Sequence, residues 1–399
     1  MKHDCDVLVV GGGTAGVPAA VAAARAGAVT VLAERRDTLG GTGVFGLHRY
    51  LCGLYPTPDT AHPDRPDSPG DRLLNAGLIS EIITALHRLS PSLHPLRLGK
   101  ADVLPYAPNA LRMAFEELTA AEPRLTVRLG TSVGVARFDG ERIVSVSLGD
   151  RECRPRTIVD CSGDGVIIRS HAALHDAPPA RGCQLAGYVI HLAGIDPGDD
   201  LLPIKVPYVL RQAAESGALS SSLRFTAFVP DDAAGEGWCK LSVPAGTDDR
   251  TAAAESVRLH ATLRDALPAF RASRIVGASP GVLEREGARL KGVHTLTADE
   301  VLAGTRFPDA IARTAWPIEL WDPDHGPMYR HLEPGMACDI PLRCLHSAVA
   351  RNLFCAGRCI SATHEALGSV RVMGPCMAMG EAAGREAARL TGLTEDRLV

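Results

Sequence analysis

The sequence predicts an α/β fold, in which a parallel sheet and a β-meander are interrupted by an inserted α+β domain. Three observations carry this prediction. A β-branched run at 7–10 precedes a Gly-rich turn, residues 125–160 alternate with period two, and residues 352–356 return to a buried-strand pattern before a last small-residue helix. The predicted parts are an N-terminal part at 1–170, an inserted substrate domain at 171–335, and a C-terminal part at 336–399.

The turn after the first predicted strand has the residues that a bound dinucleotide requires. Gly11 permits the tight turn, Gly13 has no Cβ and lets the backbone approach a pyrophosphate, and Gly16 lets the next helix pack closely on the strand. Thr14 and Ala15 open that helix, whose free N–H groups favour a phosphate. We therefore predict a dinucleotide site at this turn.

An acidic residue at the end of the second predicted strand selects the kind of ribose. Glu34 follows the apolar run 29–33 and lies 18 residues after Gly16. A carboxylate at this position accepts hydrogen bonds from a ribose diol and repels a 2′-phosphate. Arg35, next to it, belongs to the same predicted binding site.

Composition and charge argue against several other classes of function. A net charge of −4 and a pI near 6.4 argue against a nucleic-acid partner. No apolar run approaches the ~20 residues of a membrane span. The first strand begins too early to leave room for a signal peptide, so we expect a cytoplasmic protein. The eleven cysteines include no C-x-x-C pair, which favours reduced thiols and no metal site.

The regions between the motifs are predicted with less detail. Residues 55–71 hold five prolines and four aspartates, and they form either a lid over the active site or a surface loop. Helical spacing is found at 73–89, 108–121, 200–216 and 251–267, and strand patterns at 187–192 and 223–229.

Three separated motifs resemble those of one protein family. The longest is AGRCISATHEALGSVRVMGPCMAMGEAAG at 356–384, and the others are TLTADEVLAG at 295–304 and DCSGDG at 160–165. In these motifs the chain resembles the bacterial FAD-dependent oxidoreductases of the glutathione-reductase-like flavoprotein superfamily. It departs from the family pattern at Val166, where an acid is usual, and at Arg358, where many flavoproteins have aspartate. Residues 196–280 match no motif.

The resemblance implies a Rossmann-like FAD-binding domain that holds FAD non-covalently. The pyrophosphate is assigned to the turn 11–16, and a second glycine pair is assigned to Gly40 and Gly41, followed by Thr42. The other positions implied to contact FAD are Ser162, Gly163, Asp164, Gly357, Arg358, Gly374, Cys376 and Met377. The N–H groups from Gly374 to Met377 are expected to point at the pyrimidine ring of the flavin.

The number of nucleotide motifs bears on the reaction. There is no second GxGxxG, so a dedicated NAD(P)H domain is not expected. We predict a dehydrogenase or desaturase that oxidises a small polar metabolite by hydride transfer to flavin N5, with reoxidation by oxygen, a quinone or an electron-carrier protein. The alternatives are a reductase of an activated C=C bond, a flavin monooxygenase, and a non-catalytic flavin-binding protein. We expect a monomer or a homodimer.

Two side chains of the last motif are candidates for the chemistry. His364 either acts as the acid/base or only bonds the backbone of a packed loop. Arg371 either anchors a substrate carboxylate or forms an ion pair with Glu365 or Glu381.

Two further candidates are less specific. Cys376 is predicted at a helix N-terminus, where it is either a thiol with a lowered pKa or, as we favour, a small packed residue. His48 follows the second glycine pair and either reaches the substrate face of the flavin or is structural, the second being favoured for a lone histidine.

Overall fold

The computed structural model describes residues 3–57, 73–178, 182–231 and 233–392, so most of the predicted loop at 55–71 lies outside the described residues. At its centre is a five-stranded parallel sheet in the order β21-β10-β1-β2-β6. Its strands are β1 (Cys5–Val10), β2 (Thr30–Ala33), β6 (Leu125–Arg128), β10 (Pro155–Asp160) and β21 (Leu353–Cys355). Because β21 pairs with β10, the two ends of the chain form one sheet, as the α/β prediction requires.

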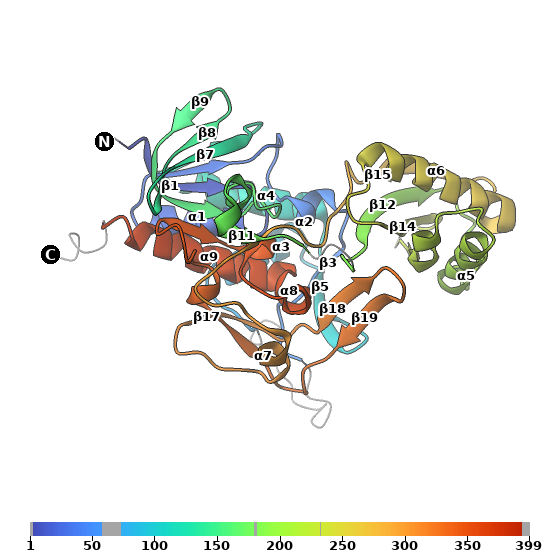
Figure 1. Ribbon diagram of the computed structural model, residues 1–399. Coiled ribbons are helices and arrows are strands. Elements are labelled where there is room, and N and C mark those ends of the chain that lie inside the picture. Colours follow the sequence, from blue (N-terminus) through green and yellow to red (C-terminus); the bar gives the residue numbers. More distant parts are fainter. Residues whose placement is uncertain (1–2, 58–72, 179–181, 232, 393–399) are drawn as a thin grey trace.

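Alternate residues of β1 face two different layers. Val7 and Val9 belong to the core shared with the helices, whereas Leu8 and Val10 belong to the core shared with an antiparallel meander. The meander comprises β7 (Val133–Asp139), β8 (Arg142–Leu148) and β9 (Arg151–Cys153), and its first hairpin turns at Asp139-Gly140 as predicted. Figure 1 shows the meander on one side of the sheet and α1 and α9 on the other.

Two thin helices lie side by side on the helical face of the sheet. They are α1 (Gly16–Arg25) and α9 (Met373–Arg389), which contact each other along their length. A Cβ added to Gly380 or Gly384 of α9 would overlap the carbonyl oxygens of Ala15 and Ala19 in α1. The small residues therefore bring the two helix backbones into direct contact, and α9 lies directly beside the N-terminal glycine turn.

The inserted segment forms a second lobe with its own core. Its four-stranded antiparallel sheet has the order β13-β14-β12-β15, and two helices cover it (Figure 1). The elements are β12 (Ala186–Ala193), α5 (Leu202–Glu215), β13 (Ala227–Pro230), β14 (Glu236–Val243), α6 (Asp249–Ala266) and β15 (Arg274–Ala278). The buried residues of this core fall within 186–270, whereas Leu296, Val301 and Ala312 join the core on the helical face of the parallel sheet. The separate core of the lobe therefore takes its residues from only part of the range 171–335.

The remaining elements connect the lobe to the sheet. They are α2 (Thr42–Phe45), β3 (Tyr50–Leu51), α3 (Leu78–Leu89), β4 (Leu96–Leu98), β5 (Ala101–Pro105), α4 (Pro108–Ala120), β11 (His175–Asp176), β16 (Arg289–Leu290), α7 (Ala298–Leu302), β17 (Ala310–Thr314), β18 (Ile318–Asp322), β19 (Gly326–Arg330), β20 (Cys338–Pro341) and α8 (His364–Val370). Within the described ranges, no helix has both the length and the apolar character needed to cross a bilayer.

Two predicted elements differ from the structure. The helix predicted at 73–89 begins only at Leu78, whose N–H donates to Glu381 Oε2 at 2.8 Å. The strand predicted at 223–229 is a 3₁₀ turn at Ser221–Phe225, followed by β13. The turn buries Leu223 completely in the core of the lobe, so tertiary packing prevails over local β propensity there.

Candidate functional site

The two predicted glycine motifs meet in the structure. Gly11 has φ 96°, and a Cβ on Gly16 would overlap the carbonyl oxygen of Gly11. Gly13 pairs with Gly40 in an isolated parallel bridge, and a Cβ on Gly41 would lie 2.9 Å from Gly13 Cα. The result is a strip of backbone without side chains at the N-terminus of α1, as close contact with phosphate requires.

Glu34 is fixed beside this strip. Its Oε2 accepts a hydrogen bond from Gly12 N at 2.6 Å, and its Oε1 accepts one from Arg36 N at 2.9 Å. The carboxylate is 6% exposed and lies at the carboxyl end of β2. These contacts orient it next to the glycine turn, where a ribose would have to lie if its pyrophosphate contacted Gly13.

The second motif forms a loop held by a buried carboxylate. Asp160 accepts hydrogen bonds from Ser162 N, Ser162 Oγ and Ile167 N, at 3.0, 2.6 and 2.9 Å. Burial raises the pKa of Asp160 although these hydrogen bonds oppose the rise. The side chain thereby shapes the turn that contains Gly163 and Asp164.

Arg358 is engaged by that loop. Its Nη2 lies 3.1 Å from Asp164 Oδ1, and its Nη1 donates to the carbonyl oxygen of Glu284. Arg35 Nη2 lies 3.5 Å from the other oxygen of Asp164. Three residues predicted from sequence to contact the cofactor are therefore brought together as one ionic group.

The start of α9 differs from the sequence expectation. Gly374 N donates to Cys52 O at 2.9 Å, Pro375 has no N–H, and Cys376 N donates to Val372 O at 3.1 Å. These three positions present no free N–H to a flavin ring. Burial raises the pKa of the Cys376 thiol to about 12, so the alternative of a lowered pKa is not met, and the packed residue is what the structure shows.

His364 forms a buried pair with Glu286, a residue that sequence reasoning missed. Nδ1 of His364 lies 2.8 Å from Glu286 Oε2, and the Glu286 side chain is only 2% exposed. The hydrogen bond to Glu286 raises the pKa of His364. Burial opposes ionisation of Glu286, but the hydrogen bonds from His364 and from Gln184 N outweigh it and lower the pKa of that carboxyl. His364 thus bonds a carboxylate, and neither sequence alternative had named this partner.

A hydrogen-bonded chain links this pair to Arg371. Gln184 N donates to Glu286 Oε1 at 2.6 Å, and Gln184 Oε1 accepts from Arg371 Nη2 at 3.4 Å. Arg371 Nη2 also approaches Glu319 O at 3.3 Å. Two buried donors of this chain, Arg371 Nε and Gln184 Nε2, have no hydrogen-bond partner in the described part of the protein. Both atoms are enclosed by protein, so an acceptor on a ligand could reach them only after the surrounding side chains move.

The ion pair predicted for Arg371 with Glu381 is absent because Glu381 has other partners. Glu381 accepts from Leu78 N at the start of α3 and from Arg385 one turn along α9. Nor does any carboxylate of the described residues, Glu365 included, lie within 4.0 Å of Arg371. Burial lowers the pKa of Arg371, because removing a cation from water disfavours its charged form when no counter-ion is in contact.

His48 lies among cations that come from the inserted lobe and from the last motif. Burial, together with the charges of Lys240, Arg285 and Arg371, lowers its pKa to about 4. The imidazole is therefore neutral near pH 7. Lys240 lies on β14, within the stretch 196–280 that matches no motif, and Arg285 follows β15 just beyond that stretch. Neither residue was singled out from the sequence.

Glu319 is the acid that faces these cations, and sequence reasoning missed it too. Its Oε2 accepts from Trp316 Nε1 at 3.0 Å, and its Oε1 accepts from Trp321 Nε1 at 2.7 Å. The guanidinium of Arg285 also makes a cation–π contact with the ring of Trp321, with Cζ 4.1 Å from the ring centroid. Both carboxylate oxygens of Glu319 are thus held by indole groups.

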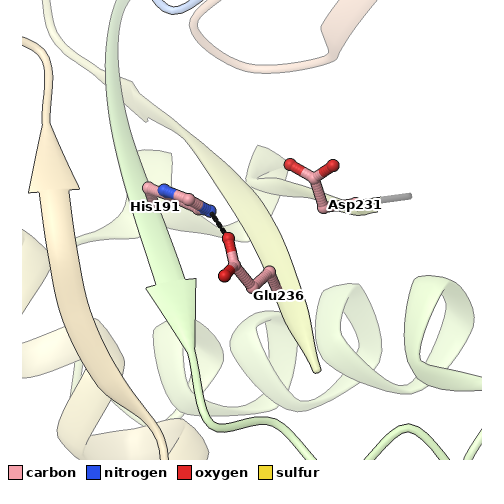
Figure 2. A group of neighbouring side chains, drawn as sticks. All are labelled: His191, Asp231 and Glu236. Atoms are coloured by element: carbon pink, nitrogen blue, oxygen red, sulfur yellow. Dashed lines mark ion pairs between the residues drawn. The ribbon is translucent and has the colours of Figure 1, made fainter. Parts of the chain in front are cut away.

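A third polar group in the lobe consists of His191, Asp231 and Glu236 (Figure 2). Their potential ligand atoms lie within 4.8 Å of one another, but protein groups already bind them. His191 Nε2 lies 2.7 Å from Glu236 Oε2, and Asp231 Oδ2 lies 2.9 Å from Arg49 Nη1. Trp238 donates to Asp231 at 2.6 Å and stacks on His191 at 3.9 Å. We interpret this group as a structural network in which Asp231 forms an ion pair with Arg49.

Comparison with known proteins identifies the type of molecule. A profile of the family described as FAD dependent oxidoreductase matches residues 6–185 and 219–392. Among solved structures, the chain is similar to CabE, an aromatic hydroxylase from angucycline biosynthesis, with a TM-score of 0.52 and 13% identity. It is also similar to the OxyS anhydrotetracycline hydroxylase from Streptomyces rimosus, with a TM-score of 0.50 and 12% identity. The alignments cover 98% and 97% of this chain, but 64% and 62% of those chains, and at these identities they support the fold alone.

Proposed function

The chain belongs to the family of FAD-dependent oxidoreductases, and from that premise we propose a dehydrogenase or desaturase of a small polar metabolite in which His364 accepts the proton. The observation that carries the proposal is the 2.8 Å contact between His364 Nδ1 and the buried carboxylate of Glu286. A histidine oriented by a carboxylate is the arrangement that general-base catalysis requires.

The cofactor is FAD, and the residues present fit it. The glycine strip at Gly13 and Gly41 has no Cβ atoms to obstruct a pyrophosphate, and Glu34 lies beside it for the ribose. Arg371, which is only half-buried and is hydrogen-bonded to Gln184, could meet an acceptor of the ring system or of a substrate. When bound, FAD supplies a two-electron acceptor.

The proton is the part of the reaction that this chain must handle. Oxidation of a C–H bond next to an O–H, an N–H or a second C–H removes two hydrogens, one as a hydride that carries the two electrons to the acceptor and one as a proton. Because Nδ1 of His364 is directed at Glu286, exchange with a substrate would take place at Nε2. Glu286 stabilises the imidazolium that results, as its raising of the pKa of His364 indicates.

Arg371 and His48 would orient the substrate. Arg371 keeps its position through Gln184 Oε1 and the backbone of Glu319, and the residue is only half-buried, so a ligand could reach its exposed part. His48 is neutral at physiological pH because of its burial, so it could donate or accept a hydrogen bond without adding charge. Electrons would then leave to oxygen or to an external carrier.

The test is anaerobic reduction of the FAD-loaded protein by candidate substrates, followed through loss of the flavin absorbance. We expect His364→Gln to retain FAD and to be reduced about 10²- to 10⁴-fold more slowly, the usual contribution of a general base. Arg371→Met should mainly raise the substrate concentration needed. His325→Gln is the matched control, because His325 has the same 2.8 Å Nδ1–carboxylate contact with Asp322 but is exposed.

The same experiment separates the alternatives. If His364→Gln is reduced as fast as the parent protein, the assignment of the base is wrong. If no organic substrate bleaches the flavin but an external reductant does, and the reduced protein is then reoxidised by an activated C=C bond, the enzyme works in the opposite direction.

A further inference from the structure

We propose that this enzyme acts on an organic acid, whose carboxylate is bound by Lys240 and Arg285 of the inserted lobe. The inference rests on the proposed function in one respect, namely that the substrate lies beside Arg371. It adds the chemical class of the substrate and two specificity-determining residues, which no sequence motif indicates.

The cations converge from separate segments onto one space. Lys240 comes from β14, Arg285 from the segment after β15, Arg371 from the α8–α9 junction, and His48 from the segment before β3. Each is half-buried, so part of each side chain is still accessible. Arg285 and Arg371 approach the same strand, since Arg285 Cζ lies 4.1 Å from the ring centroid of Trp321 and Arg371 Nη2 lies 3.3 Å from Glu319 O. Lys240 pairs with Val189 of β12, two residues from Gly187, where an added Cβ would lie 3.7 Å from Arg285 Nη2.

The cations of this cluster have no ion-pair partner in the described part of the protein. No carboxylate oxygen there lies within 4.0 Å of Lys240, Arg285 or Arg371. The acids that act on them from farther away are already engaged: Glu319 accepts from Trp316 and Trp321, Glu286 from His364, and Glu284 from Gly246 N. Arg49, the further cation that acts on Lys240, is paired with Asp231. An anionic ligand would therefore supply the direct partner that these partly desolvated cations lack.

The geometry of Arg285 favours a planar carboxylate as that anion. Its guanidinium lies over the ring of Trp321, with Cζ 4.1 Å from the centroid, and its Nη1 donates to Leu185 O, so two contacts hold the group before a ligand binds. A fixed guanidinium presents its remaining N–H groups as a fork that matches the two oxygens of a carboxylate. Lys240, 6.0 Å from the ring centroid of Tyr50, adds a point charge that tolerates several positions of the acid group.

The two parts of the protein would thus hold different parts of the substrate. His364 and Arg371 belong to the motif that the FAD-binding part supplies, whereas Lys240 and Arg285 come from or just after the lobe. A substrate bound across the two would present its acid end to the lobe and its reacting bond to His364. Related chains with another lobe residue at 240 or 285 would accept other substrates.

The experiment measures binding without turnover, using the oxidised FAD-loaded protein. Acetate, succinate and glutarate are titrated against acetamide, succinamide and glutaramide, with tryptophan fluorescence and the flavin absorbance band as readouts. Trp316 and Trp321 contact the carboxylate and the guanidinium of the cluster, so occupation should alter their emission. We expect at least one acid to bind and its amide not to bind.

Variants then locate the site. Lys240→Gln and Arg285→Gln should each weaken binding of the acid at least about tenfold, the effect of removing one charge-assisted hydrogen bond. Lys205→Gln and Arg211→Gln are matched controls, because they remove the same charges from exposed positions on α5 of the same lobe, and they should leave binding unchanged. FAD content should be equal in all five proteins.

The outcomes separate the two proposals. The inference is overturned if no acid binds up to about 10 mM, a very weak affinity, if the amides bind as well as the acids, or if the two variants bind like their controls. Binding that depends on Lys240 and Arg285 upholds it, even if no bound acid reduces the flavin. In that last case it is the dehydrogenase proposal that would be in question.

Discussion

The glycine strip around Gly13 and Gly41 and the cationic cluster of His48, Lys240, Arg285 and Arg371 are built in opposite ways. The strip is made of backbone atoms from two short segments, and its residues are close in the sequence or carry a fixed spacing. The cluster is made of side chains from four segments between residues 48 and 371. A pyrophosphate, which many proteins bind, can be held by backbone atoms of a local motif. The residues that we propose to select the substrate come from distant segments, and no motif marks them.

We expect the largest effect, a loss of bound FAD, from a substitution that disrupts the glycine strip. Gly16→Ala places a Cβ onto the carbonyl oxygen of Gly11, so the turn must move, and the protein should be purified without FAD. The ratio of flavin to protein absorbance measures this. Gly277→Ala in β15 is the control, since a Cβ there would meet its nearest atom, of His191, at 3.6 Å and should cost nothing. Retention of FAD by Gly16→Ala would show that the strip is more adaptable than its geometry indicates.

A second comparison tests whether the two cores are independent. Phe115 and Phe270 are both fully buried, the first in the core of the FAD-binding part and the second in that of the lobe. Each substitution by alanine should destabilise its core by about 3–5 kcal/mol. We expect Phe115→Ala to lower FAD retention and Phe270→Ala to preserve it while abolishing binding of the acid. Thermal unfolding followed separately by flavin and by tryptophan fluorescence would measure this, and identical losses in both variants would mean that the cores unfold together.

We expect the smallest effect in the pH dependence of flavin reduction, which reports the proton that His364 accepts. If His364 accepts a proton, the reduction rate must fall as the pH drops below its pKa, which the hydrogen bond with Glu286 raises above the ordinary value of 6.5. Glu286→Gln removes that cause and leaves burial, which lowers the pKa, so the acidic limb of the rate profile should move to lower pH. Stopped-flow reduction across pH measures the shift. A limb that falls on the alkaline side instead would mean that His364 donates a proton.

The parts of the fold that sequence reasoning predicted are those set by local physics. β1, α1, the meander and α9 follow from strand and helix periodicity, and Gly11, Gly16 and Gly384 follow from close packing of backbones. The strand predicted at 223–229 failed because Leu223 is buried by a 3₁₀ turn in a core that only the folded lobe creates.

At the site, sequence reasoning named residues but misjudged their partners. One of the two alternatives for Arg371 was an ion pair with Glu365 or Glu381, yet Glu381 caps α3, and the contacts of Arg371 are with Gln184 and the backbone of Glu319. The amide of Gly374 was expected to point at the flavin and is bound by Cys52 O. These partners lie at least 52 residues away along the chain, and no local pattern encodes them.

The sequence by itself determined a dinucleotide fold, the FAD-type glycine pairs and a reactive last motif, because each depends on residues within a few turns or strands of one another. Only the tertiary structure decided what surrounds that motif. It placed Glu286 behind His364, left buried donors on Arg371 and Gln184 unpaired, and gathered Lys240 and Arg285 without a counter-ion. The physical reason is that hydrogen bonds and charge balance are set by distance in space, which the order of residues along the chain does not record.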